Sequence, residues 1–191
     1  MIKFHTNKEL SRAFKINLAK WKRWSREFLP PDPLGGLQSG YARQYNLDEG
    51  FTIFLGGHLV GNLKFTIPES RQILNDLHQW LVDHDFYFDF SGTANPVKES
   101  GHPVQNYQIA IINRKISGGS TFGFSYWVKA VLSAEPVDFG DDQIRQEQFI
   151  ETLIGPLADR PAYLSAEVES YCVLNINALR QNFLNSLQMI T

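Results

Sequence analysis

The sequence predicts an α+β protein, with a mainly helical N-terminal domain over residues 1–84 and a small α+β module with an antiparallel hairpin or sheet over residues 85–191. Two helix-start signatures, each followed by apolar residues at helical spacing, predict the helical part. Two runs of alternating apolar residues predict the hairpin. With 191 residues, 43% of them hydrophobic and 20% charged, the chain can bury a sizeable core as one domain or two small ones.

The first two helices are expected to be short and closely connected. Thr6 and Glu9 form a capping box, so one helix should begin near Asn7. Asn17 can cap a second helix that runs to Phe28, because Pro30 and Pro31 cannot continue it. Five residues of this second helix recur at helical period and should face the core: Leu18, Trp21, Trp24, Ser25 and Phe28.

Two longer helices are expected to complete the N-terminal domain. Residues 32–36 have the composition of a turn or loop, and the segment 39–45 should be an extended loop or short hairpin. A third helix is expected over 51–60, shortened by three glycines in the stretch 56–62. Thr66 and Glu69 form a second capping box, which predicts a fourth helix ending near residue 83 or 84.

The C-terminal half has a strand pattern with helices near its end. Apolar residues alternate over 107–111 and again over 122–130, and the linker 117–120 contains two glycines, which predicts an antiparallel hairpin. Asp141-Asp142 could cap a helix that ends at Gly155-Pro156 and whose apolar face is Phe149, Ile150, Leu153 and Ile154. A strand is expected over 171–174, and Asn177 is expected to cap a last helix.

Charge is distributed unevenly along the chain. The formal net charge is -2, yet nine of the 18 Lys and Arg residues lie within residues 1–45, together with only three acids. Four of these bases fall in the second helix: Lys20, Lys22, Arg23 and Arg26. A local basic face of this kind is the electrostatic footprint of a polyanion-binding protein, although a solvated helix face with no partner has the same appearance.

Within residues 5–81, four segments follow one another along the chain: "TNKELSRAF", "WKRWSREFLPP", "SGYARQY" and "LKFTIPESRQIL". In this order they resemble the DNA-binding domain of MerR-type transcriptional regulators, a winged helix-turn-helix. "TNKELSRAF" is similar to the opening helix of that family, and "WKRWSREFLPP" to its second helix and Leu-Pro-Pro exit. "SGYARQY" is similar to the Gly-Tyr-Arg-x-Tyr of the wing, and "LKFTIPESRQIL" to the start of the fourth helix.

The resemblance implies that the second helix is a recognition helix in the major groove of double-stranded DNA. Lys22 and Arg26 match the two basic positions of the family in that helix, and Arg43 and Tyr45 match the wing positions that hold backbone phosphate. We add Lys20 and Arg23 to the expected interface because they belong to the same cluster of basic residues, and not because of the resemblance.

The role of the C-terminal module is left open by the sequence. Members of the family usually continue into a long dimerising helix, but residues 85–104 contain no heptads, so a coiled-coil dimer is not expected. A homodimer formed by the module itself remains open. Four aromatic residues could line an effector pocket for a small molecule or could be core residues: Phe122, Phe124, Tyr126 and Trp127.

Several other classes of site have no sequence signal. Cys172 is the only cysteine, so an internal disulfide and a cysteine-based metal site are excluded, and no glycine-rich phosphate loop is present. We expect no catalytic residues and no cofactor. No apolar run has the length of a membrane span, and residues 1–10 lack the apolar core of a signal peptide, so a cytoplasmic protein is expected.

Three classes of function agree with these patterns. The first is a DNA-binding transcriptional regulator with a sensing or dimerising C-terminal module. The second is an architectural or phage-type accessory DNA-binding protein. The third is a protein-interaction module or an enzyme that reuses the N-terminal fold.

Overall fold

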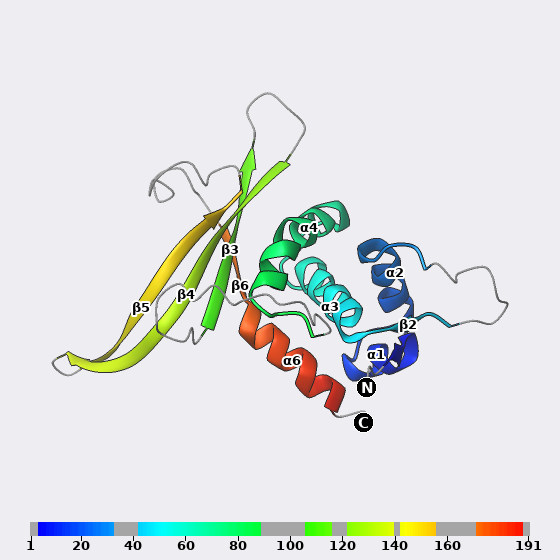
Figure 1. The fold of residues 1–191 in the computed structure, drawn as a ribbon, viewed down its shortest axis with the longest axis horizontal. Helices are drawn as coiled ribbons and strands as arrows, with labels where there is room; N and C mark the ends of the chain where they lie inside the picture. Colours follow the sequence, from blue (N-terminus) through cyan, green and yellow to red (C-terminus); the bar gives the residue numbers. More distant parts are fainter. Residues whose placement is uncertain are drawn as a thin grey trace. The chain divides into compact units, whose positions relative to one another are not determined.

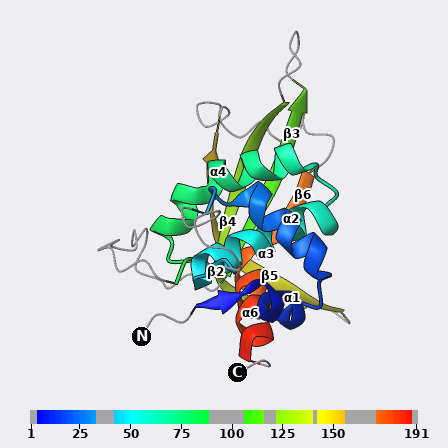
Figure 2. The ribbon, with the colours of Figure 1, turned by 90° about the vertical axis from the view of Figure 1, so that its right-hand side faces the viewer.

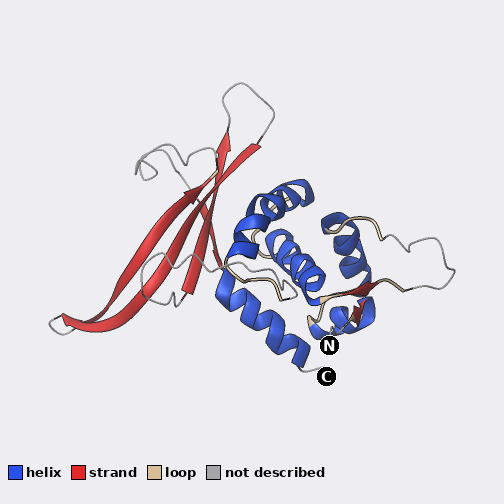
Figure 3. Ribbon diagram, in the orientation of Figure 1, coloured by secondary structure: helices blue, strands red, loops and turns tan. Residues whose placement is uncertain are grey.

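The computed structural model describes residues 4–32, 42–88, 106–115, 122–139, 142–155 and 171–188. Within these ranges the chain is α+β, with five α-helices and two antiparallel sheets (Figures 1 and 3). The chain divides into two compact units, unit 1 with residues 1–97 and 180–191 and unit 2 with residues 98–179. The sequence placed every residue after 84 in the second module, whereas residues 85–97 and 180–191 belong to the first unit.

Unit 1 is mainly helical, and the side chains that cap three of its helices are those that the sequence predicts. Thr6 and Thr66 each form a complete capping box with the glutamate three residues later, and the Asn17 side chain accepts from two backbone amides. The elements are β1 (His5–Thr6), α1 (Asn7–Ala13), α2 (Leu18–Phe28), β2 (Gln44–Tyr45), α3 (Leu47–Gly61), α4 (Ile67–Asp83) and most of α6 (Ile176–Gln188). β1 and β2 pair antiparallel, with His5 opposite Tyr45.

The expectation that glycines shorten the third helix is wrong. α3 is 15 residues long and contains Gly56 and Gly57 in its interior. A Cβ at Gly56 would meet the ring of Phe28, and a Cβ at Gly57 would meet the ring of Trp24. The two glycines therefore let two large rings of α2 lie directly on the backbone of α3, and Figures 1 and 2 show the two helices side by side.

An aromatic cluster around α6 forms much of the core of unit 1. Phe183 is fully buried, and its ring stacks on Phe14 with centroids 5.2 Å apart. It also meets Phe51 edge-on at 5.4 Å and Phe54 at 5.7 Å. Arg180 donates to the carbonyl of Phe86 at 3.1 Å. The last helix of the chain is thus an integral part of the N-terminal unit.

Unit 2 contains a four-stranded antiparallel sheet in the order β5-β4-β3-β6. Its strands are β3 (Asn106–Lys115), β4 (Phe122–Phe139), β5 (Asp142–Ile154) and β6 (Tyr171–Asn175). β3 and β4 form the hairpin that the alternating apolar residues predicted, with Ile109 opposite Val128 and Ile111 opposite Tyr126. β6, also expected from the sequence, pairs with the other edge of β3.

Two expectations for the C-terminal half are wrong. Residues 142–154 form a strand, not a helix, because β5 pairs with β4 along its whole length, from Asp142 opposite Phe139 to Ile154 opposite Tyr126. The last helix begins at Ile176, so its capping residue is Asn175, whose side chain accepts from the amide of Ala178 at 3.0 Å. Asn177 lies inside the helix and accepts from the amide of Tyr107 at 2.7 Å.

No helix in the described parts of the chain has both the length and the apolar character needed to cross a membrane.

Candidate nucleic-acid interface

The two faces of α2 differ sharply in burial. Trp21 and Trp24 are 0% and 5% exposed, so they fix the inner face of the helix. The outer face carries Lys22, Arg23 and Arg26, all exposed. Arg26 is a helical neighbour of both others, because it lies three residues after Arg23 and four after Lys22. The exposed Ala19 lies one turn earlier on the same face. This arrangement presents cations beside a small side chain that does not obstruct a close approach.

Contacts with α3 and α4 fix the position of α2. The rings of Trp24 and Phe28 lie over the glycines of α3. Arg71 of α4 donates from Nε to the Glu27 carbonyl at 2.9 Å and from its guanidinium to the Glu27 carboxylate at 2.6 Å. The C-terminal turn of α2 is therefore bound to both α3 and α4. These contacts hold the charged side chains on the outer face of α2 at a fixed position on unit 1.

The cations of the outer face have no counter-charge on the helix. Glu27 is the only acid of α2, and its carboxylate is engaged by Arg71. Within the described residues, the side chains of Lys22, Arg23 and Arg26 form no hydrogen bond and no ion pair. Lys20 lies at the side of this face, with its ammonium 4.8 Å from the centroid of the Trp24 ring. We call the outer face of Lys20, Lys22, Arg23 and Arg26 the basic face.

Arg43, which the resemblance assigns to a phosphate, has an internal role in the structure. Its side chain is 15% exposed. Nη1 donates to the carbonyl of Pro30 at 3.0 Å, and Nη2 is 3.2 Å from the Glu49 carboxylate, while the guanidinium lies over the Tyr45 ring at 5.4 Å. Because Pro30 follows α2 and Glu49 belongs to the capping box of α3, Arg43 joins the exit of one helix to the start of the next.

Tyr45, the other expected phosphate ligand of the wing, is 1% exposed. Its hydroxyl donates to Asn7 Oδ1 at 2.9 Å and lies 3.2 Å from Ser25 Oγ. In this position the hydroxyl connects α1 with α2 and does not reach solvent. Tyr41, the other aromatic residue of the expected wing, lies outside the described residues.

The four aromatic residues considered for an effector pocket do not share one face of the sheet. Phe124 and Tyr126 are 2% and 1% exposed and lie on the buried face with Val128. Trp127 alternates to the opposite face, where it lines a hollow. Phe122 is paired with Lys115 at the end of β4, and its side chain is outside the described residues.

Sequence reasoning missed two parts of these sites. The Arg71–Glu27 contact joins positions 44 residues apart, and no local pattern reveals such a pair. The hollow on the sheet is lined by residues of all four strands, so it requires the strand order that only the structure supplies. In the described ranges, no group of three or more His, Cys, Asp or Glu side chains is arranged to hold a metal ion.

Comparison with known proteins adds no family to this description. No protein-family model matches the chain, and no significant match is found among curated protein sequences.

Proposed function

We propose that unit 1 binds double-stranded DNA, with the basic face of α2 in the major groove, as the recognition helix of a winged helix-turn-helix transcriptional regulator of MerR type. The observation that carries the proposal is the basic face itself, where four exposed cations lie on one helix whose only acid, Glu27, is paired with Arg71. The sequence resemblance over residues 5–81 supports the choice of DNA over other polyanions.

The geometry of α2 suits this role. The major groove admits one α-helix, and its base edges distinguish all four base pairs. Lys22 and Arg26 lie one turn apart on the exposed surface, so both can face the same groove. Arg26 can reach a guanine in a bidentate contact, whereas the lysines supply contacts to phosphates that carry no sequence information.

The role of the wing is revised in this proposal. Arg43 and Tyr45 are engaged inside unit 1, so they act by fixing α2 and not by holding phosphate. The expected electrostatic contribution then comes from the four cations of α2. If all four neutralise phosphates, the logarithm of the binding constant should fall by about 3.6 per logarithmic unit of salt concentration.

The test is fluorescence anisotropy of a labelled mixed-sequence duplex titrated with the full chain at several salt concentrations. In the double variant Lys22→Gln/Arg26→Gln the salt slope should fall by about 1.8 on this mixed-sequence duplex if both side chains neutralise a phosphate there, and by about 0.9 if Arg26 contacts a base instead. Lys64→Gln is the control, since Lys64 is an exposed cation on the turn between α3 and α4 and its ammonium is bonded to the Gly61 carbonyl. This control should leave the slope unchanged.

Two results would refute DNA binding through α2. One is the absence of salt-sensitive affinity for duplex DNA at low salt. The other is an equal loss of slope in Lys64→Gln and in either single variant of the basic face, which would indicate diffuse attraction to the whole surface. Selection of one duplex from a random pool would then distinguish a regulator from an accessory protein that binds without sequence preference.

A further inference from the structure

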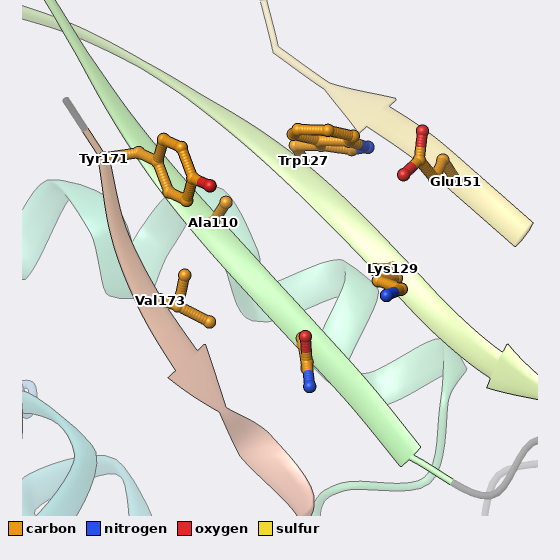
Figure 4. A pocket seen from close by; sticks show the side chains of 7 residues that line it. Ala110, Trp127, Lys129, Glu151, Tyr171 and Val173 are labelled. Atoms are coloured by element: carbon orange, nitrogen blue, oxygen red, sulfur yellow. The ribbon is translucent and has the colours of Figure 1, made fainter. Parts of the chain in front are cut away.

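The sheet of unit 2 has a hollow of about 230 Å³ on one face. Its floor is Ala110 on β3, which is paired with Trp127 of β4 on one side and with Val173 of β6 on the other. The small alanine between larger neighbours leaves the space, and Figure 4 shows Trp127 and Tyr171 standing on either side of it. The other lining residues are Gln108, Lys129 and Glu151.

Large apolar side chains are exposed at this hollow. Tyr171 and Val173 on the edge strand β6 are 55% and 47% exposed. On the opposite face of the same sheet, Ile109 and Ile111 are almost completely buried. Exposed apolar residues that gather at a concave site, and do not lie scattered over the surface, are typical of a binding site.

The polar end of the hollow carries one carboxylate in excess. Lys129 is already neutralised, because its ammonium is 2.7 Å from the Glu147 carboxylate and 4.2 Å from the centroid of the Phe149 ring. Glu151 lies opposite Lys129 on β5 and is exposed. Lys129, Glu147 and Glu151 have formal charges of +1, -1 and -1, and their sum of -1 favours a cationic ligand.

We propose that this hollow binds a small aromatic amine. Its ring would lie between Trp127 and Tyr171 over Ala110, and its ammonium would pair with Glu151. The faces of Trp and Tyr rings also attract a cation directly, so both ends of such a ligand are matched. The volume is below the range of about 300 to 1,000 Å³ that is usual for drug-sized ligands, which limits the occupant to about one ring with a short side chain.

The proposal does not depend on DNA binding, because every residue involved belongs to unit 2. The experiment is isothermal titration calorimetry of the full chain with three probes that share a phenylethyl body: phenethylamine, 2-phenylethanol and 3-phenylpropionate. The three probes have the same apolar part and differ in charge: phenethylamine is positive, 2-phenylethanol is neutral and 3-phenylpropionate is negative. We expect phenethylamine to bind most tightly and 3-phenylpropionate least.

Two variants and a control separate charge from shape. Glu151→Gln should weaken the binding of phenethylamine by up to about five-fold and leave 2-phenylethanol unchanged, since only the cation loses its partner. Ala110→Leu should abolish binding of all three probes, because the added side chain fills the hollow. Glu135→Gln removes the same charge from an exposed position of β4 outside the hollow and should change nothing.

Far-UV circular dichroism and the melting temperature of each variant identify any variant that fails to fold. If Ala110→Leu fails to fold, the binding data for Glu151→Gln decide the outcome. The proposal is overturned if phenethylamine does not bind, if the amine and the acid bind equally, or if Glu151→Gln and Glu135→Gln have the same effect.

Discussion

The packing of α2 on α3 can be tested at a single glycine. In Gly57→Ala the new Cβ would lie 2.5 Å from Cε3 of Trp24, closer still to Cζ3, and 2.9 Å from Cη2. Trp24 is 5% exposed, so its ring has no free space into which it could turn. The substitution must therefore move the ring, and with it the helix that carries the basic face.

Two opposing effects set the magnitude. Alanine in a helix interior is favoured over glycine by about 1 kcal/mol. Overpacking of a filled core costs about 1 to 3 kcal/mol, and three ring carbons within 3 Å place this site at the upper end of that range. We expect a net loss of about 2 kcal/mol in the free energy of unfolding of Gly57→Ala.

Gly61 at the end of the same helix is the matched control. A Cβ there would meet no atom within 4 Å, so Gly61→Ala should keep the propensity gain of up to about 1 kcal/mol. Denaturant unfolding followed at 222 nm reports on both, since helices supply most of this signal. The reasoning is refuted if the two variants differ by less than about 0.5 kcal/mol, or if Gly57→Ala is the more stable of the two.

Three further predictions concern other parts of unit 1. Arg43→Lys should weaken DNA binding while the salt slope stays unchanged, because Arg43 fixes helices; a slope smaller by about 0.9 in anisotropy titrations would instead indicate a lost phosphate contact. Phe183→Ala should cost about 3 to 5 kcal/mol of unfolding free energy in denaturant titrations, and the exposed Asn185→Ala almost nothing; equal losses would contradict a core role for α6. Burial lowers the pKa of His58 below 6.5, so the unfolded chain takes up a proton before the folded one and stability should fall as the pH drops below 6.5. His58→Gln should reduce this dependence in urea unfolding between pH 7.5 and 5, and an unchanged dependence would exclude His58 as its source.

The helices of unit 1 could be predicted because their signals are local. A capping side chain satisfies amides two or three residues away, so Thr6, Asn17 and Thr66 mark helix starts whatever the rest of the chain does. The exposed face of α2 could also be predicted from local residues. Because Trp21 and Trp24 are buried, the residues between them must point outward. The basic face was therefore visible in the sequence.

The β5 strand was mispredicted because its stability is not local. Phe149, Ile150, Leu153 and Ile154 have a helical spacing that strand pairing overrides. β4 continues to Phe139, and this length offers β5 a partner for every residue from Asp142 onward. Four apolar residues at helical spacing stabilise a helix less than a hydrogen-bonded ladder of that length stabilises a strand. The ladder requires the full length of β4, which the sequence predicted only as far as residue 130.

The roles of Arg43 and Tyr45 could not be read from a motif. A matched position indicates which residue type is present, but the structure determines whether its polar atoms are already used. The Tyr45 hydroxyl is bonded to Asn7, 38 positions away, and Arg43 bridges Pro30 and Glu49. Partners at such separations become neighbours only after the helices have packed.

The position of Phe183 sets a condition on every experiment with the helical unit. A fragment that ends at residue 84 would lack the ring that packs on Phe14, Phe51 and Phe54, and the space beside Gly50 would lie open. Burying a Phe side chain contributes about 1.5 to 3 kcal/mol, a large share of the stability of a small domain. Loss of DNA binding in such a fragment would therefore report on the missing α6 and not on the basic face. Only the full chain, with charge changes confined to exposed residues of α2, separates the two.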